Sequence, residues 1–205
     1  MYLVGVTGKV ASGKGEVCRY FGKLGAAVVN ADEVAAEMMG KRDSASLIKA
    51  EFGDEVMDEN GNIDRKWLAR MVFSNKNKLR KLNENFLPMI ADLIKQHLKK
   101  ISEHEDIVIL EAPLLFQAKL DSLCDFVIMI KSNRNNRIKR LILNRGMESQ
   151  EAILRVNGQN LRMPEKKADL VIDNNGSLNE LFNKAKEAYS LIERKASRKL
   201  YDEQI

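Results

Sequence analysis

The stretch from Gly8 to Lys14 carries residue types that can hold a phosphate group. It matches the first seven positions of the pattern G-x-x-x-x-G-K-[ST], in which successive backbone N–H groups point inward at an anion. Gly8 and Gly13 permit backbone angles that other residues avoid, and Lys14 can neutralise the β- and γ-phosphates of a nucleotide. The pattern predicts a phosphate-binding loop, and the alternative is a glycine-rich turn without a ligand.

The eighth position of the pattern is Gly15, which lacks the hydroxyl that Ser or Thr would supply to a bound Mg²⁺. Glycine also weakens the first turn of a helix. Because Mg²⁺ keeps several waters when it binds to proteins, a water can occupy the vacant coordination position. The loop therefore predicts nucleotide binding more directly than it predicts full catalytic activity.

Two acidic side chains follow predicted strands and could do chemistry beside such a loop. Asp32 could accept a proton from a hydroxyl group that attacks the γ-phosphoryl group, or it could cap the following helix. Glu111 could hold Mg²⁺ directly or through water, or it could be a structural acid at the turn before Pro113. The sequence alone supports both interpretations of each residue.

Basic side chains concentrate in residues 131–167, which hold ten of them against three acidic ones, in a chain of net charge +5. Such a patch predicts a polyanionic partner, either a phosphorylated small molecule or a nucleic acid, and the alternative is a solvated helical face. Arg155, Gln159 and Arg162 fall on one helical face, and Arg137 and Arg140 lie one turn apart. Arginines on a mobile helical pair could close over transferring phosphates and exclude water.

These residues follow short apolar strands that alternate with helical segments. The predicted strands are Tyr2–Val6, Ala26–Val29, Ile107–Leu110, Phe126–Ile130 and Leu170–Ile172. Short strands without polar alternation, separated by helices, predict a parallel sheet covered on both faces, and such sheets bind ligands at the carboxyl ends of their strands. The expected fold class is therefore α/β, with a five-stranded parallel sheet flanked by helices.

The helical segments have the 3.6-residue apolar period. They are Lys14–Leu24, Val34 to about Lys100, two helices within 134–164 around Arg145-Gly146, and Leu178–Tyr201. The long second segment is expected to be interrupted by a turn at Asp58–Gly61 and by a break or kink at Pro88.

Composition excludes several classes of protein. Apolar residues make up 44% and charged residues 31%, which is ordinary for a globular protein and excludes disordered and collagen-like chains. No apolar run approaches the roughly 18 residues of a membrane span. Cys18 and Cys124 are too few for a disulfide framework, show no metal-ligand spacing and favour buried thiols. The first ten residues lack the features of a signal peptide, so a cytoplasmic location is expected.

In combination, these segments resemble the bacterial dephospho-coenzyme A kinase family over nearly the full chain. The matching residues are Gly5–Gly8, Gly13-Lys14, Asn30–Asp32, Gly61–Ala69, Ala112–Phe116, Arg137 with Arg140, Arg145-Gly146, Arg155 with Gln159, and Ala168–Gly176. The resemblance implies ATP-dependent phosphorylation of the ribose 3′-hydroxyl of dephospho-coenzyme A, with Mg²⁺. It also implies a P-loop core at 1–33, 105–133 and 168–205, a helical substrate-binding insertion at 34–104 and a basic lid at 134–167.

The resemblance assigns roles to single residues. Asp32 matches the general base, Lys14 the lysine of the loop, and Arg140 a phosphate-clamping position. Glu111 is the expected metal ligand. The residues expected to bind the nucleotide are Gly8, Ala11, Ser12, Gly13, Lys14, Gly15, Glu16, Arg145, Asn174, Asn175 and Gly176, the last three being the segment near the ATP base.

Three positions depart from the pattern of the family. Gly15 replaces Ser or Thr, Asn30 replaces the first Asp of an Asp-Ala-Asp triplet, and Leu87 replaces a His before Pro88. The first departure bears on the metal site, and the other two bear on substrate binding.

Three further functions follow from the same residues. The chain could be a P-loop kinase for another small hydroxyl acceptor, or a nucleotide-binding module that has lost catalysis through Gly15. Nucleic-acid binding by residues 131–167 is disfavoured, because the segment lacks interleaved aromatic side chains for base stacking. The expected partner is dephospho-coenzyme A, without nucleic acid or membrane.

Overall fold

The computed structural model describes residues 1–73, 75–159, 161 and 163–202. The chain divides into two compact units. Residues Met1–Asn30 and His97–Ile205 form the first, here called the sheet unit, and Ala31–Gln96 form the second, here called the helical unit. The three-part organisation expected from the sequence, with a separate lid, stays a prediction.

The sheet unit is built on five strands. They are β1 (Tyr2–Gly8), β2 (Ala27–Asn30), β3 (Ile107–Glu111), β4 (Phe126–Lys131) and β5 (Leu170–Asp173). All pairs are parallel and the order is β2-β3-β1-β4-β5, which confirms the predicted five-stranded α/β fold. The strands extend one or two residues past the apolar runs, because polar residues such as Asn30 and Glu111 still pair with each other in the ladder.

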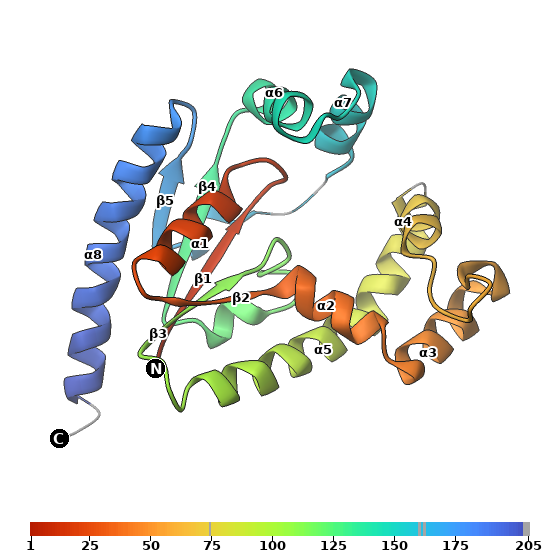
Figure 1. Cartoon of the computed structure of the whole chain (residues 1–205), viewed down its shortest axis with the longest axis horizontal. Coiled ribbons are helices and arrows are strands. Elements are labelled where there is room, and N and C mark those ends of the chain that lie inside the picture. The colour runs from red at the N-terminus through yellow and green to blue at the C-terminus, as the bar shows by residue number, and fades with distance from the viewer. Residues whose placement is uncertain (74, 160, 162, 203–205) are drawn as a thin grey trace. The chain divides into compact units, whose positions relative to one another are not determined.

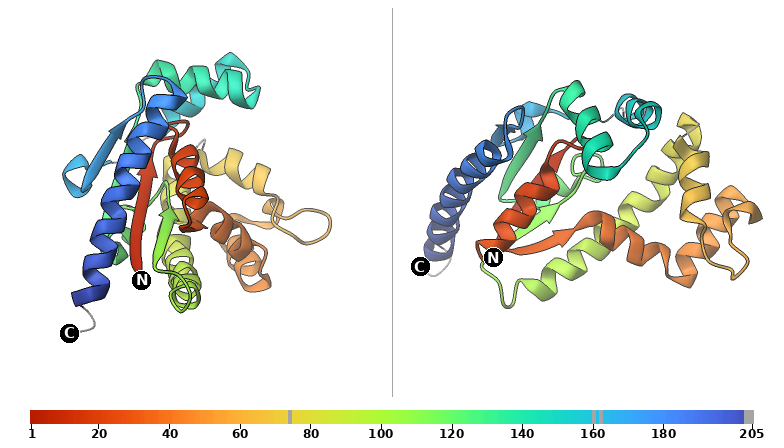
Figure 2. Two further views of the ribbon diagram at one scale, coloured as in Figure 1. Left: turned by 60° about the vertical axis from the view of Figure 1, so that its left-hand side comes forward. Right: turned by 45° about the horizontal axis from the view of Figure 1, so that its top comes forward.

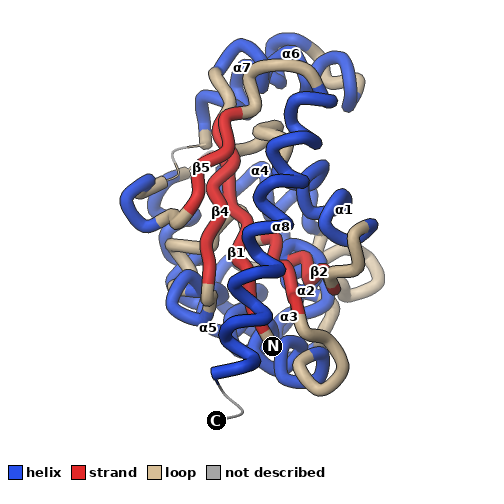
Figure 3. The backbone as a smooth tube through the Cα atoms, turned by 90° about the vertical axis from the view of Figure 1, so that its left-hand side faces the viewer, coloured by secondary structure: helices blue, strands red, loops and turns tan. Residues whose placement is uncertain are grey.

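The central strand and two helices form the main core. All seven residues of β1 are buried, as expected for a strand covered on both faces. Helices α1 (Lys14–Lys23) and α8 (Leu178–Asp202) lie side by side along one face of the sheet (Figures 2 and 3). Phe21 of α1 and Tyr189 of α8 place their ring centroids 5.4 Å apart, and the Tyr189 hydroxyl donates to the Leu24 carbonyl at 3.2 Å.

Two basic helices lie beyond the carboxyl ends of the strands (Figure 1): α6 (Arg134–Arg145) and α7 (Ser149–Gly158). Asn133 caps α6 by accepting the N–H of Asn136 at 2.8 Å, and Gly146 ends the helix with φ near 62°, a conformation that suits glycine. The predicted boundary at Arg145-Gly146 therefore matches a helix C-terminus. The sheet unit also contains the 3₁₀ turns η2 (Leu120–Leu123) and η3 (Glu165–Lys167).

The helical unit has a separate apolar core. Its elements are α2 (Ala31–Met39), α3 (Arg42–Phe52), the 3₁₀ turn η1 (Asp54–Val56), α4 (Arg65–Phe73) and most of α5 (Lys76–Ile101). The predicted turn forms because the Asp58 carboxylate accepts the N–H groups of Asn60 and Asn62 at 2.9 and 2.8 Å. Helix α5 continues through Pro88, so the helix is not broken there, and Phe86 is buried in the core of the helical unit. None of the described helices has the length and apolar character needed to span a membrane.

The close packing around Gly5 of β1 predicts that a larger residue there lowers the stability of the protein. A Cβ there would lie 2.7 Å from the Cys124 Sγ and 3.0 Å from a Leu115 methyl group, so Gly5→Ala overpacks the core. We expect the free energy of unfolding to fall by about 1–3 kcal/mol in urea titrations followed by circular dichroism. The matched control is Gly158→Ala in α7, where a Cβ meets nothing within 4 Å and stability should be unchanged or slightly higher. Equal stability of the two variants would contradict the prediction.

Candidate functional site

The loop between β1 and α1 has the backbone of an anion-binding site. Gly13 has φ near 100° and Ala11, which is not a glycine, has φ near 56°. Positive φ at a residue with a side chain is uncommon and costs energy, so the surrounding structure must enforce it. Helix α1 begins at Lys14, so the N–H groups of its first turn are available to a ligand. Ser12 Oγ is buried and has no hydrogen-bond partner among the described residues.

Lys14 forms an ion pair with Glu111. Its ammonium lies 3.1 Å from the Glu111 carboxylate, and each side chain is only 14% exposed. Glu111 ends β3 and is in register with Val6 of the neighbouring central strand. The nearby Cys18 thiol stays protonated, because burial and the Glu111 charge raise its pKa well above its usual value. Glu111 is therefore the counter-ion that a bound phosphate would have to replace.

The missing hydroxyl at Gly15 leaves space that faces the same carboxylate. A Cβ at Gly15 would lie 3.5 and 3.9 Å from the two carboxylate oxygens of Glu111, which is ordinary van der Waals contact. The described residues contain no group of three or more His, Cys, Asp or Glu side chains that could hold a metal ion. Mg²⁺ in phosphate-transfer sites needs only one or two carboxylates together with phosphate oxygens and waters. One carboxylate beside an open space is compatible with that requirement.

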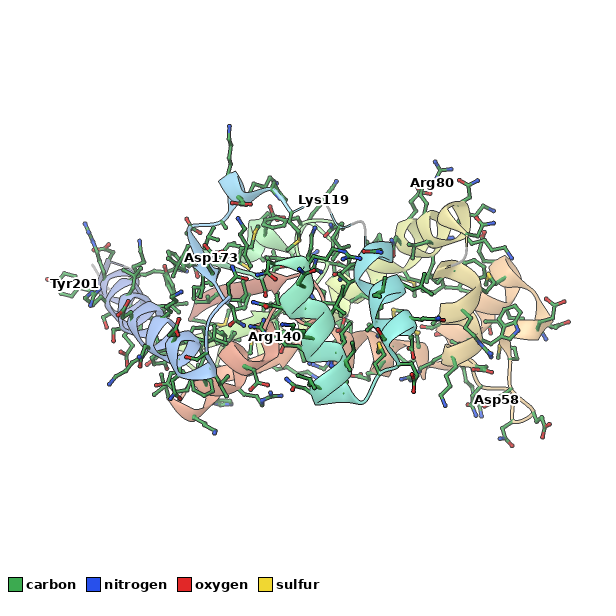
Figure 4. The ribbon with its side chains drawn as sticks, turned by 90° about the horizontal axis from the view of Figure 1, so that it is seen from above. Asp58, Arg80, Lys119, Arg140, Asp173 and Tyr201 are labelled. Carbon is green, nitrogen blue, oxygen red and sulfur yellow. The ribbon has the colours of Figure 1, made fainter. Side chains whose placement is uncertain are left out.

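Arg140, which is labelled in Figure 4, lies in α6 and contacts the carbonyl side of the loop. Its two terminal nitrogens lie within 3.5 Å of the Ala11 and Ser12 carbonyl oxygens, the Ser132 hydroxyl, and the carbonyl and side-chain oxygens of Asn174. Asn174 is buried and donates its side-chain amide to the Ser12 carbonyl at 2.7 Å. The expected clamping of a phosphate by Arg140 stays a prediction, since these acceptors occupy the terminal nitrogens in this structure.

Gln159, which the sequence placed on one face with Arg155, contacts the loop, and this contact was not predicted. It follows the end of α7, and its side-chain oxygen accepts the N–H of Val10 at 2.6 Å. Val10 and Ala11 also pack against the apolar cluster of α6 and α7. The helical spacing from Arg155 predicted that Gln159 shares a face with Arg155. Arg155 itself is exposed, and Arg162 lies outside the described residues.

The remaining expected nucleotide-binding residues lie in several elements of the sheet unit. Asn175 joins β5 to the start of α6, because its side-chain oxygen accepts the Asn133 N–H at 2.8 Å and its carbonyl accepts from Asn136 at 3.1 Å. Gly176 follows in the same turn. Glu16 pairs with Arg19 on the exposed face of α1, and Arg145 is exposed at the end of α6.

Asp32 lies in the helical unit, in the first turn of α2. Because α2 begins at Ala31, Asp32 is inside the helix and is not its N-cap residue. Asn30, two residues earlier in the chain, pairs with Glu111 in the sheet ladder. Leu87 lies within α5.

Comparison with known proteins identifies the family of this chain. A model of the dephospho-CoA kinase family matches residues 2–180. A dephospho-CoA kinase of Fusobacterium nucleatum is 36% identical over 184 residues, which are 89% of this chain and 94% of that protein. A crystal structure of a Thermus thermophilus protein has a TM-score of 0.75 at 28% identity, covering 91% of this chain and 95% of that one.

A dephospho-CoA kinase of Campylobacter jejuni has a TM-score of 0.66 at 23% identity, covering 94% of this chain and 98% of that one, which supports the fold. The family match spans the loop, Asp32, Glu111 and the segment Asn174–Gly176 in one continuous stretch. By this match, the chain belongs to the dephospho-CoA kinase family.

Proposed function

We propose that this protein transfers the γ-phosphoryl group of ATP to the ribose 3′-hydroxyl of dephospho-coenzyme A, producing coenzyme A and ADP. The observation that carries the proposal is the Lys14–Glu111 pair at the first turn of α1, at the carboxyl edge of a parallel sheet. A lysine at this place can exchange its carboxylate partner for a nucleotide phosphate. The family match supplies the acceptor.

The loop is arranged to bind phosphate through its amides. A planar trans peptide directs its C=O and N–H in opposite directions. Asn174 and Arg140 hold the Ser12 carbonyl, and they thereby direct the Gly13 N–H to the opposite side of the loop. We propose that this N–H, the first amides of α1 and the Lys14 ammonium bind the β- and γ-phosphates.

Asp32 is proposed as the general base. Its carboxylate accepts the proton of the 3′-hydroxyl as that oxygen bonds to the γ-phosphorus, and the bond from the γ-phosphorus to the bridging oxygen of ADP breaks. The backbone of Asp32 is fixed in the first turn of helix α2. Glu111 would hold Mg²⁺, which when bound neutralises negative charge on the phosphates.

The first prediction tests the reaction and its base. Purified protein should release ADP in a coupled assay only when ATP, Mg²⁺ and dephospho-coenzyme A are all present. Asp32→Asn should lower kcat by about 10²- to 10⁴-fold, because the proton acceptor is lost, while ATP affinity is kept. The matched control is Asp43→Asn on the exposed first turn of α3, which should leave kcat unchanged.

ADP release with another hydroxyl acceptor, and none with dephospho-coenzyme A, would overturn the proposed substrate. Full activity of Asp32→Asn would overturn the assigned base.

The second prediction concerns the missing hydroxyl at Gly15. Both Gly15→Ser and Gly15→Ala fit the space beside Glu111 and should strengthen the first turn of α1 by up to about 1 kcal/mol. Gly15→Ser alone adds a ligand, so it should lower the Mg²⁺ concentration for half-maximal ADP formation several-fold. Titration of Mg²⁺ at fixed ATP measures this directly.

Identical Mg²⁺ dependence of the Ser and Ala variants would show that the hydroxyl is not limiting. ATP binding by the natural protein without turnover, together with turnover by Gly15→Ser, would favour a nucleotide-binding module that has lost catalysis.

A further inference from the structure

A cavity beside the C-terminal part of α8 is lined mainly by cationic side chains. Its volume is about 580 Å³, which is within the usual range of small-molecule sites. Tyr2 of β1 forms an aromatic wall, and the charged residues of α8 that line the cavity are Arg194, Lys195, Arg198, Lys199 and Asp202. Four cations and one carboxylate around one space attract an anion.

The cavity lies at the opposite edge of the sheet from the phosphate-binding loop. Tyr2 is the first residue of β1, and Gly8, where the loop begins, is the last. A strand rises about 3.3 Å per residue, so roughly 20 Å separate the two ends. Figure 3 shows the N-terminus beside the C-terminal part of α8, whereas α6 and α7 lie at the other end of the sheet unit. A ligand in this cavity is therefore distinct from one bound at the loop.

The two lysines of the cavity are held by contacts within the protein. Lys199 lies 2.8 Å from the Asp125 carboxylate, and its ammonium also donates to the Met1 carbonyl at 3.4 Å. The Lys195 ammonium lies 5.5 Å from the centroid of the Phe126 ring, in a cation–π contact. An ammonium group has three N–H donors, so Lys195 keeps hydrogen-bonding capacity for a ligand.

The two arginines of the cavity are available to a ligand. Arg194 and Arg198 are both exposed, and neither forms a hydrogen bond or an ion pair with a residue that the structure describes, Asp202 included. They are four residues apart, so their side chains are neighbours on one face of α8, where like charges repel each other. Each guanidinium group can bind one phosphate through two N–H donors. The pair therefore suits two phosphate groups, which would also remove the repulsion.

Cations near the C-terminus of a helix can instead stabilise the helix dipole. That effect is confined to the last turn, and α8 ends at Asp202. It accounts for Lys199, but Arg194 lies about two turns before the end of the helix. The dipole therefore does not explain the whole group of cations.

A nucleic acid fits the cavity less well than a small anion does. The cations occupy little more than one turn of one helix, which is too short to follow an extended phosphate backbone. The aromatic ring in the cavity is that of Tyr2, which is only 5% exposed and so offers no surface on which a base can stack. A compact ligand with few phosphate groups is favoured.

We infer that this cavity is a second anion site, separate from the phosphate-binding loop, and that it binds a small ligand with two linked phosphate groups. Arg194 and Arg198 bind one phosphate group each, and Lys195 adds a third cation. Free pyrophosphate and nucleoside diphosphates both carry this group. The inference does not depend on the proposed function, because it uses no residue at the carboxyl edge of the sheet.

The first experiment is a titration with inorganic pyrophosphate at low ionic strength, followed through the amide resonances of isotope-labelled protein. We expect two separate sets of shifts, one at residues 8–14 and the other, here called the α8 set, at Tyr2 and residues 194–199. Because two phosphate-binding forks are lost, the double variant Arg194→Gln with Arg198→Gln should raise the dissociation constant of the α8 set by at least about tenfold. The shifts at residues 8–14 should not change.

The matched control is the double variant Lys23→Gln with Lys186→Gln. It removes the same number of charges from exposed positions of α1 and α8 that do not line the cavity. Both sets of shifts should remain as in the natural protein.

Two further probes define the ligand. Orthophosphate should bind at the α8 set about tenfold more weakly than pyrophosphate, because it can occupy only one of the two arginines. ADP tests the source of the linked phosphates. Tighter binding of ADP than of pyrophosphate would identify a nucleotide, and equal binding would identify the diphosphate group alone. Both results support the inference.

The inference is overturned by the absence of shifts at residues 194–199, by shifts that the arginine double variant retains, or by equal shifts with orthophosphate or chloride at the same ionic strength. Preferential binding of a single-stranded oligonucleotide or of anionic lipid vesicles would assign the surface to a macromolecule and would also overturn it. A natural protein that forms no ADP with dephospho-coenzyme A would contradict the proposed function and leave this inference standing.

Discussion

The hydrogen bonds to one carbonyl oxygen, that of Ser12, determine how the backbone of the loop is oriented. Asn174 donates to it at 2.7 Å, and Arg140 reaches the same oxygen while also holding Asn174. Because C=O and N–H of one peptide point apart, the contact on one side of the loop orients an amide on the other. The sheet makes this contact possible, because the parallel strands β1 and β5 end at the same edge and bring Ser12 and Asn174 together.

A second constraint is the balance of charge around the loop and helix α6. Lys14 is neutralised by Glu111, whereas Arg137 is not neutralised by any described residue. The two cations therefore differ in their surroundings, because Lys14 lies against a carboxylate and the buried Nε and Nη1 atoms of Arg137 have no described acceptor. Stability given up at a buried charge is a common feature of sites that bind charged ligands.

The sequence predicted the fold well, because parallel strands buried on both faces leave continuous apolar runs that are easy to recognise. The predicted strands ended one or two residues too early, because Asn30 and Glu111 are polar and still pair with each other in the sheet. At Pro88 the helix continues, because the packing of Phe86 and its neighbours outweighs the local preference of proline.

The site was predictable only in part. The loop follows a fixed spacing, so Gly8–Lys14 could be found from residue types alone. The partner of each arginine could not, because Arg137 and Arg140 are both basic residues on one helix and differ only in what surrounds them. The contact of Gln159 with the loop was not predicted for the same reason. The type of an amide side chain does not indicate which backbone N–H it accepts.

The contact between Ser12 and Asn174 spans 162 positions along the chain. A ribosome adding about 5–20 residues per second needs on the order of ten to thirty seconds to cover that separation. The N-terminal strand and its glycine-rich turn therefore emerge before β3 and β4, and well before the asparagine that holds the turn. The contact between Ser12 and Asn174 is thus among the last to form on the nascent polypeptide, although the loop is among the first segments to be synthesised.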